Sequence, residues 1–194
     1  MIPRPDTELL VNLALEKLQP NMRVADLGTG SGAIALSLAS EQTQVQVFAM
    51  DYSLAALQVA RDNAQKNKLN NVQFWQGSWL DAVADNSFDL IVSNPPYIEQ
   101  DDPHLKQGDL RFEPLSALAS GDDGLDDIRL IIEQAKTTLK SNCYLIIEHG
   151  FDQAKKVQTL LQQAGFDDIN SHQDFGANDR VTMGRISKLH EDAG

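Results

Sequence analysis

The chain has 194 residues, a length that suits one domain with a sizeable core, because domains usually run to roughly 100–200 residues. Apolar residues make up 42% of it and charged residues 23%, close to globular averages, which excludes a disordered or low-complexity protein. The formal net charge is −12, which repels polyphosphate and argues against a dedicated nucleic-acid-binding surface.

The sequence also argues against a membrane protein and a metalloprotein. No run approaches the roughly 18–20 apolar residues of a membrane span, and residues 1–6 do not resemble a signal peptide, so a soluble protein is expected. The single cysteine, Cys143, cannot form an internal disulfide and is expected to be a small buried side chain, as in a protein of the reducing cytoplasm. One cysteine and four scattered histidines lack the spacing of structural zinc ligands, so no metal site is predicted.

Apolar residues recur at helical spacing in five segments and form short or alternating runs in seven others. In chain order, the predicted elements are a helix over 7–18, a strand over 24–27, a helix over 33–39, a strand over 45–50, a helix over 54–64, strands over 72–75 and 88–92, a helix over 128–139, a strand over 144–148, a helix over 154–164, and strands over 168–174 and 180–186. Ser53 is a suitable N-cap for the third helix, and Gly165 suits the position just after the last helix.

Strands and helices alternate along most of the chain, which indicates an α/β protein with a Rossmann-like, mostly parallel sheet and helices on both faces. The last two strands are joined by turn residues over 175–179 and are expected to form an antiparallel hairpin. Ligands of such sheets bind outside the carboxyl ends of the strands, where the glycine cluster 28–32, Asp51 and residues 94–97 fall. The polar stretch 98–123 is longer than an ordinary connection and is predicted to be a functional loop.

The glycine cluster after the first strand points to an adenosine-type ligand. Gly28, Gly30 and Ala33 match the loose dinucleotide-binding fingerprint, in which glycines let the backbone approach the ligand closely. Asp51 follows Gly30 by 21 residues, where an acid that holds ribose hydroxyls is expected. The alternative is a glycine turn that binds nothing.

Two features favour S-adenosylmethionine over NAD as that ligand. Asp26 stands two residues before Gly28, where its carboxylate would attract the ammonium group of an aminoacyl tail and repel a pyrophosphate. The terminal antiparallel hairpin also fits a methyltransferase sheet better than a second mononucleotide-binding half. We therefore expect Asp26 to belong to the cofactor site.

The segment Asn94-Pro95-Pro96-Tyr97 indicates the chemistry. The lone pair of a planar amide or amino nitrogen is delocalised, so an enzyme that alkylates it must hold both N–H groups in place. The Asn94 side-chain oxygen and the Pro95 carbonyl can accept those two hydrogen bonds. Pro96 stiffens the backbone, and Tyr97 offers a π face to the planar group and to a nearby sulfonium charge. A rigid turn would be the preferred interpretation of this motif in isolation, but its place after the fourth strand favours a function.

These motifs resemble the S-adenosylmethionine-dependent methyltransferases of planar nitrogens, which include N6-adenine DNA methyltransferases and protein glutamine N5-methyltransferases. The sequence is most similar to the peptide chain release factor N5-glutamine methyltransferases, along nearly its whole length. The matching segments are 2–8 (Ile-Pro-Arg-Pro-Asp-Thr-Glu), 26–35, 92–97, 107–114 (Gln-Gly-Asp-Leu-Arg-Phe-Glu-Pro), 148–150 (Glu-His-Gly) and 179–181 (Asp-Arg-Val). The resemblance implies a class I methyltransferase fold with a seven-stranded sheet.

The resemblance also implies roles for individual residues. The implied catalytic residues are Asn94, Pro95 and Tyr97, and these three together with Pro96 hold the substrate glutamine. The implied cofactor contacts are Gly28, Thr29, Gly30, Ser31, Gly32, Asp51, Trp79 and Asn94. Ser78 departs from the family, which often carries an acid at that position beside the tryptophan.

The expected reaction is methyl transfer from S-adenosylmethionine to the side-chain amide nitrogen of the glutamine in the Gly-Gly-Gln motif of class-1 peptide chain release factors, with S-adenosyl-L-homocysteine as the product. The transfer is expected to be direct, with no nucleophilic residue and no strong base. The expected partner is a release factor bound by a monomer, without direct contact to nucleic acid or to a membrane. The alternatives are an N6-adenine-type nucleic-acid methyltransferase and a catalytically silent S-adenosylmethionine-binding module.

The resemblance implies that residues 1–20 form a linker and the leading helix, residues 21–188 the methyltransferase domain and residues 189–194 a tail. Because the family also has a helical N-terminal domain that helps to dock the release factor, the chain is expected to be a piece of a longer protein. Three features are expected to have no part in binding or catalysis. His149 is expected to be a hydrogen-bonded structural residue, Trp75 a core residue, and the pair Asp122-Asp123 solvated loop charge.

Overall fold

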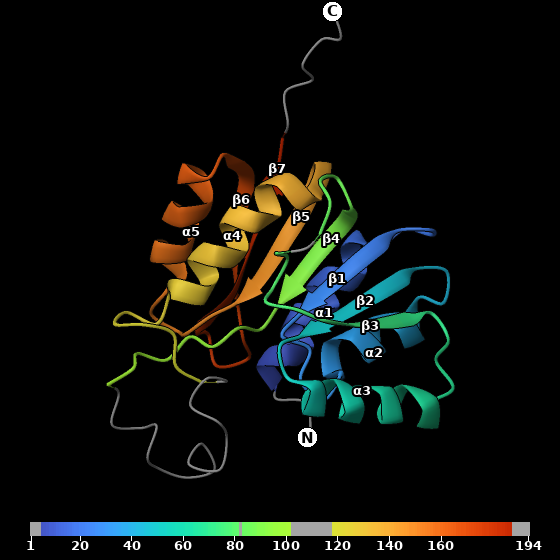
Figure 1. The fold of residues 1–194 in the computed structure, drawn as a ribbon. Coiled ribbons are helices and arrows are strands. Elements are labelled where there is room, and N and C mark those ends of the chain that lie inside the picture. The colour runs from blue at the N-terminus through green and yellow to red at the C-terminus, as the bar shows by residue number, and fades with distance from the viewer. Residues whose placement is uncertain (1–4, 82, 102–117, 188–194) are drawn as a thin grey trace, which may run out of the picture.

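The computed structural model describes residues 5–81, 83–101 and 118–187, drawn in colour in Figure 1. Over these residues the chain forms five helices and seven strands. They are α1 (Pro5–Lys17), β1 (Arg23–Leu27), α2 (Ala33–Glu41), β2 (Gln46–Asp51), α3 (Leu54–Lys66), β3 (Val72–Gln76), β4 (Phe88–Ser93), α4 (Asp126–Thr138), β5 (Leu139–Glu148), α5 (Ala154–Gln163), β6 (Phe166–Gln173) and β7 (Asp179–Ile186).

The seven strands form one sheet in the order β3-β2-β1-β4-β5-β7-β6. Neighbours from β3 to β5 run parallel, whereas β7 lies antiparallel to both β5 and β6. The predicted fold is thereby confirmed: a mostly parallel sheet that ends in an antiparallel hairpin.

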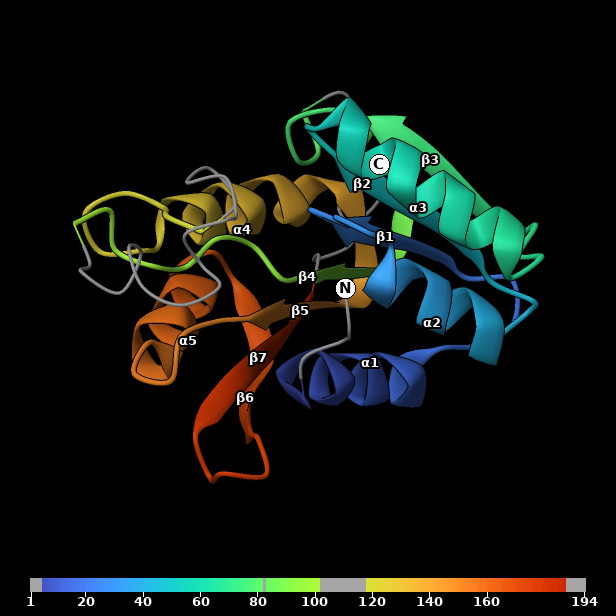
Figure 2. The ribbon, with the colours of Figure 1, turned by 90° about the horizontal axis from the view of Figure 1, so that it is seen from below.

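Helices cover both faces of this sheet (Figure 2). On one face, α1 and α2 bury Leu10, Ala14, Leu38 and other apolar residues against the strands. On the opposite face, α4 packs Ile128, Ile131, Ile132 and Ala135, spaced as on one side of a helix, against strand residues such as Ile91. Strands buried on both faces explain why the central runs read as continuously apolar.

Some sequence-based expectations need correction. Strand β5 begins at Leu139, five residues earlier than predicted. The prediction placed Leu139 in the preceding helix because it keeps helical spacing from Ala135, but its backbone is already extended. Trp75 is 40% exposed, since β3 is the edge strand of the sheet, although its ring packs edge-on against Phe48. Cys143, expected to be buried, is only partly buried.

None of the helices that the structure describes combines the length and the apolar character needed to cross a membrane. The domain boundaries expected near residues 20 and 188 stay predictions.

Candidate active site

The sheet brings the separate sequence motifs to one edge. The arrowheads of β1, β2, β4 and β5 point to the same side of the molecule in Figure 1. Two hydrogen bonds join the glycine cluster to the end of β2, since the Thr29 N–H donates to the Met50 carbonyl at 2.9 Å and the Gly30 N–H donates to Asp51 Oδ2 at 2.8 Å. Asn94 directly follows β4, the other neighbour of β1. The backbone segments that carry the predicted ligand-binding residues are therefore neighbours at one edge of the sheet.

Gly28 and Gly30 in the turn after β1 adopt conformations that favour glycine. Gly28 and Gly30 have φ angles of +70° and +55°, which side-chain-bearing residues adopt at a cost. A Cβ atom on Gly28 would lie 3.2 Å from the ring of Trp79, whereas one on Gly30 would meet no atom within 4 Å. The turn thus fits closely against Trp79 and leaves open space above Gly30.

Thr29, Ser31 and Gly32 help to hold the turn and the start of α2 through their hydrogen bonds and their backbone. The Thr29 hydroxyl donates to Asp26 Oδ2 at 2.6 Å and is buried, so it points into the protein rather than toward a ligand. The Ser31 carbonyl accepts a hydrogen bond from Asn63 Nδ2 of α3 at 3.0 Å, and Gly32 is the N-cap of α2. These contacts hold the N-terminal end of α2, with its free N–H groups, beside the turn.

Asp26 is the most unusual ionisable group of the site. It is fully buried, and its Oδ2 accepts hydrogen bonds from the Thr29 hydroxyl and from the Ala35 N–H at 3.0 Å. Its Oδ1 has no hydrogen-bond partner among the described residues. Burial, only partly offset by these hydrogen bonds, raises the pKa of Asp26 to about 6. A buried carboxylate oxygen without a partner is an acceptor for a cationic donor, so this side chain fits the expected ammonium group.

Asp51 ends β2 and is half-buried at the edge of the site. Its Oδ2 accepts the Gly30 N–H, and its Oδ1 accepts the Ser53 N–H at 2.8 Å. Since a carboxylate oxygen can accept two hydrogen bonds, each oxygen retains capacity for a hydroxyl of a ligand. Ser53 also caps α3, as predicted, by accepting a hydrogen bond from the Ala56 N–H.

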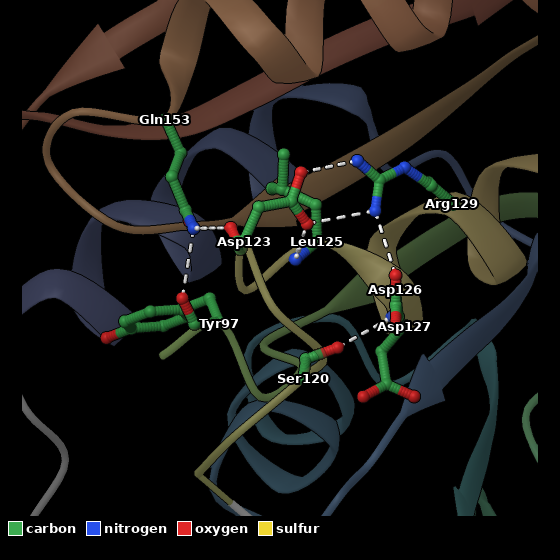
Figure 3. Close-up of polar contacts among 8 residues, drawn as sticks. All are labelled: Tyr97, Ser120, Asp123, Leu125, Asp126, Asp127, Arg129 and Gln153. Carbon is green, nitrogen blue, oxygen red and sulfur yellow. Dashed lines mark hydrogen bonds and ion pairs between the residues drawn. The ribbon is translucent and has the colours of Figure 1, made fainter. Parts of the chain in front are cut away.

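Trp79 faces the glycine turn and is held by a residue that the sequence does not single out. Its φ angle is +51°, a conformation that bulky residues rarely adopt. Its indole N–H donates to Asp127 Oδ1, in the first turn of α4, at 3.1 Å. The Asp127 N–H in turn donates to the Ser120 hydroxyl at 2.7 Å, as Figure 3 shows. The only signal for Asp127 in the sequence is an acid early in a helix, which the helix dipole alone would explain.

The segment that follows β4 presents an amide with free hydrogen-bonding capacity. Ser93 fixes the end of the strand, because its buried hydroxyl donates to the Leu27 carbonyl at 2.9 Å. No hydrogen bond joins the half-buried Asn94 carboxamide to another described residue. Pro95 is buried, and Pro96 and Tyr97 are half-buried. The Asn94 carboxamide is thus available to bind a ligand or a substrate.

The two described ends of the polar stretch 98–123 lie side by side. Ile98 and Ala119 form an isolated bridge, in which the Ile98 N–H donates to the Leu118 carbonyl and the Ser120 N–H donates to the Ile98 carbonyl, each at 3.0 Å. The two described ends of the predicted functional loop are therefore joined by hydrogen bonds, directly after Tyr97 in the chain. Residues 102–117, which include the matching segment 107–114, lie outside the described residues, as does Arg4 of the segment 2–8.

His149 is buried and hydrogen-bonded, as expected. It is buried, and its Nδ1 lies 2.9 Å from the Gly150 carbonyl, which can only accept, so this nitrogen carries the proton. Its Nε2 lies 2.7 Å from the Thr182 hydroxyl, which donates to the neutral ring. Burial lowers the pKa of His149 and stabilises this neutral form.

Asp123 is partly exposed, but it is not a purely solvated charge. Asp122 is exposed, as expected of a solvated charge, but Asp123 forms an ion pair with Arg129 at 2.5 Å and accepts the Leu125 N–H at 3.2 Å. Because the guanidinium of Arg129 donates hydrogen bonds to it, the pKa of Asp123 lies below its usual value. The pair organises the turn that leads into α4.

Comparison with known sequences supports a methyltransferase. A family model described as a methyltransferase domain matches residues 18–190. A release factor glutamine methyltransferase of Xylella fastidiosa is 54% identical over 187 residues, which cover 95% of this chain and 68% of that protein. One of Escherichia coli is 49% identical and is matched over 95% of this chain and 67% of its own length.

Comparison with solved structures agrees. A release-factor-specific protein-(glutamine-N5) methyltransferase from Alicyclobacillus acidocaldarius is 29% identical and superposes with a TM-score of 0.59 over 96% of this chain and 95% of that one. A ribosomal protein L11 methylase from Lactobacillus delbrueckii superposes with a TM-score of 0.68 over 93% of this chain and 79% of that one. Its sequence identity of 23% supports a shared fold alone.

Proposed function

Because the chain belongs to the family of release factor glutamine methyltransferases, we propose that it transfers a methyl group from S-adenosylmethionine to the glutamine side-chain amide of the Gly-Gly-Gln motif in class-1 peptide chain release factors. The observation that carries this proposal is the Asn94 carboxamide, which has free hydrogen-bonding capacity beside the glycine turn. A planar amide substrate needs such an acceptor.

The residues present fit S-adenosylmethionine as the cofactor. The unpartnered Oδ1 of Asp26 suits the ammonium group of the aminoacyl tail, and Asp51 suits the ribose hydroxyls. The backbone of Gly28 packs against the ring of Trp79, and the open space beside Gly30 leaves room for the ligand. The cofactor supplies an electrophilic methyl group on a sulfonium centre.

The substrate glutamine is held by the segment after β4. The Asn94 side-chain oxygen and the Pro95 carbonyl accept the two N–H groups of its amide, which aims the nitrogen lone pair at the methyl group. Pro95 and Pro96 restrict the backbone, and the ring of Tyr97 packs against the planar amide. Orientation of this kind contributes on the order of 7–11 kcal/mol in well-aligned reactions, so no nucleophilic side chain is required.

The alternatives receive less support. The names of the similar proteins above specify glutamine methylation. The net charge of −12 also disfavours a nucleic-acid substrate. The intact Asn94–Tyr97 segment argues against a catalytically silent binding module.

One experiment separates the three functions. The protein is incubated with methyl-labelled S-adenosylmethionine and, in separate reactions, with a class-1 release factor, with the same factor whose motif Gln is replaced by Ala, or with DNA. We expect label on the unmodified factor alone. Label on DNA would favour the adenine-directed alternative, and cofactor binding without label on any substrate would favour the silent module.

Replacing Asp51 by Ala is expected to weaken S-adenosylmethionine binding by about 1.5–3 kcal/mol, the range for hydrogen bonds that involve a charged group. Isothermal titration calorimetry measures the affinity, and thermal unfolding shows whether the lost contacts to Gly30 and Ser53 have also loosened the turn. An unchanged dissociation constant would remove Asp51 from the cofactor site.

Replacing Asp127 by Ala removes the acceptor for the Trp79 indole and is expected to weaken cofactor binding by about 0.5–1.5 kcal/mol, because the effect is transmitted through the ring. Asp127→Asn, which keeps an acceptor oxygen, should restore most of the affinity. Asp126→Ala is the matched control, since Asp126 lies next to it on α4 but pairs with Arg129. Equal losses in Asp126→Ala and Asp127→Ala would contradict the assigned contact.

A further inference from the structure

The side chain of Gln153 joins three loops of the site. Gln153 is the N-cap residue of α5 and is only 5% exposed. Its Oε1 accepts the Gly150 N–H at 2.9 Å, and its Nε2 donates to the Tyr97 carbonyl at 3.0 Å and to the Asp123 carbonyl at 3.3 Å. Figure 3 shows the amide pointing between the loops of Tyr97 and Asp123. Both Nε2 hydrogens and the oxygen of this buried amide are thereby satisfied.

We propose that Gln153 is a positioning residue for methyl transfer, which holds the Tyr97 carbonyl and thereby sets the orientation of the Asn94–Tyr97 segment. This inference rests on the proposed function, because it assigns Gln153 to the same site. Gln153 lies behind the segment and acts through its backbone, so it is not a catalytic residue.

The local sequence explains why this segment needs an external anchor. Pro95 and Pro96 have no N–H groups, so neither can donate a hydrogen bond to the rest of the protein. The Ser93 hydroxyl fixes the end of β4, and four residues later the Tyr97 carbonyl is held by Gln153. The Asn94 carboxamide and the Pro95 carbonyl lie between these two fixed points, so a shift at Tyr97 moves both proposed acceptors.

The loop on the other side of Gln153 is itself rigidly held. Asp123, whose carbonyl accepts the second Nε2 hydrogen, is fixed by two hydrogen bonds from Arg129, at 3.0 and 2.5 Å. The buried Gly124 packs so closely that a Cβ atom there would lie 2.3 Å from the Tyr97 carbonyl oxygen and 2.8 Å from Gln153 Nε2. The backbone of Gly124 therefore packs against both partners of the hydrogen bond between Tyr97 and Gln153.

The first test replaces Gln153 by Glu, which keeps an acceptor for the Gly150 N–H, loses both donated hydrogen bonds and places a carboxylate against two carbonyls. We expect kcat for release-factor methylation to fall at least about tenfold, and the dissociation constant of S-adenosylmethionine to change by less than about threefold. Amide hydrogen exchange of the peptides that cover residues 94–100 should become faster. Gln158→Leu is the matched control on the same helix, because Gln158 Nε2 donates to Ser171 Oγ at 2.8 Å, away from Tyr97.

The second test disturbs the same hydrogen bond through Gly124 and leaves the residue at position 153 unchanged. Gly124→Ala should push Tyr97 away and lower kcat in the same manner as Gln153→Glu. Gly121→Ala is its control, since Gly121 has the same φ of +70° but the three atoms nearest to an added Cβ all belong to the side chain of the exposed Asp126, which can swing into solvent.

The outcomes distinguish this inference from the proposed function. If the wild-type protein methylates no release factor, the proposed function fails, and hydrogen exchange over residues 94–100 in the variants still decides whether Gln153 holds the segment. Unchanged exchange in Gln153→Glu, or wild-type kcat in both Gln153→Glu and Gly124→Ala, would overturn the inference. A loss of cofactor affinity as large as the loss of kcat would indicate a general structural role and would overturn it as well.

Discussion

Replacing Asn94 by Ala is expected to lower kcat by about 10²–10³, comparable to removing one oxyanion-hole donor, while S-adenosylmethionine affinity changes only modestly. The carboxamide has no partner among the described residues, so its removal leaves no buried group unsatisfied and should not affect folding. The proposed cofactor contacts lie mainly at Asp26, at Asp51 and along the glycine turn. Single-turnover methylation at saturating cofactor measures the chemical step, and calorimetry measures the affinity.

Asn94→Asp is the sharper variant. Its carboxylate still accepts a hydrogen bond from the substrate amide, but it also places a negative charge beside the sulfonium of the cofactor. This charge stabilises the ground state more than the transition state, in which the sulfonium charge is being neutralised. Asn94→Asp should therefore bind cofactor more tightly than Asn94→Ala and still turn over far more slowly than the wild type. Glutamine methylation at the normal rate by Asn94→Ala would refute the positioning mechanism.

The parts of the site that the sequence predicts are those that carry local signals on strand ends. Glycines after a first strand, an acid at the end of the second and Asn-Pro-Pro-Tyr after the fourth can each be recognised within a few residues. Parallel strands place their carboxyl ends at one edge, so the alternation of strands and helices suffices to bring these motifs together. The hydrogen bond from Gly30 to Asp51 is the observed consequence.

The residues that the sequence does not reveal act across long separations and carry no periodic signal. Asp127 meets Trp79 from 48 positions away, and Gln153 meets Tyr97 from 56 positions away. In the sequence Asp127 is an acid at the start of a helix, which the helix dipole already explains, and Gln153 precedes a helix without any local signal. Tertiary packing, rather than local pattern, selects these two partners. The partner of Asp123, by contrast, is only six positions away, and the turn that leads into α4 brings Arg129 beside it.

The stability of the ligand-free protein is expected to fall by about 1 kcal/mol between pH 5 and pH 7 through Asp26 alone. An unfolded Asp loses its proton near pH 3.8, whereas the pKa of the buried Asp26 is about 6, so the folded state holds more protons between these values and loses stability as pH rises. Asp26→Asn keeps an acceptor for Thr29 and Ala35 without a charge, so this contribution should vanish. Urea unfolding of both proteins across this pH range measures the difference, and parallel curves would contradict the raised pKa.

The same carboxyl group should couple cofactor binding to pH. An ammonium group at the unpartnered Oδ1 stabilises the carboxylate, so S-adenosylmethionine that binds below pH 6 must displace the proton of Asp26. Its affinity should rise up to about tenfold from pH 5 to pH 7, a range in which a free α-amino group, with a pKa of about 7.7–8.0, stays protonated. 5′-Methylthioadenosine, which lacks the aminoacyl tail, should bind with an affinity that does not depend on pH, and Asp26→Asn should remove the dependence for S-adenosylmethionine. Calorimetry of the two ligands at each pH decides the matter, because an equal pH dependence for both would place the ammonium group away from Asp26.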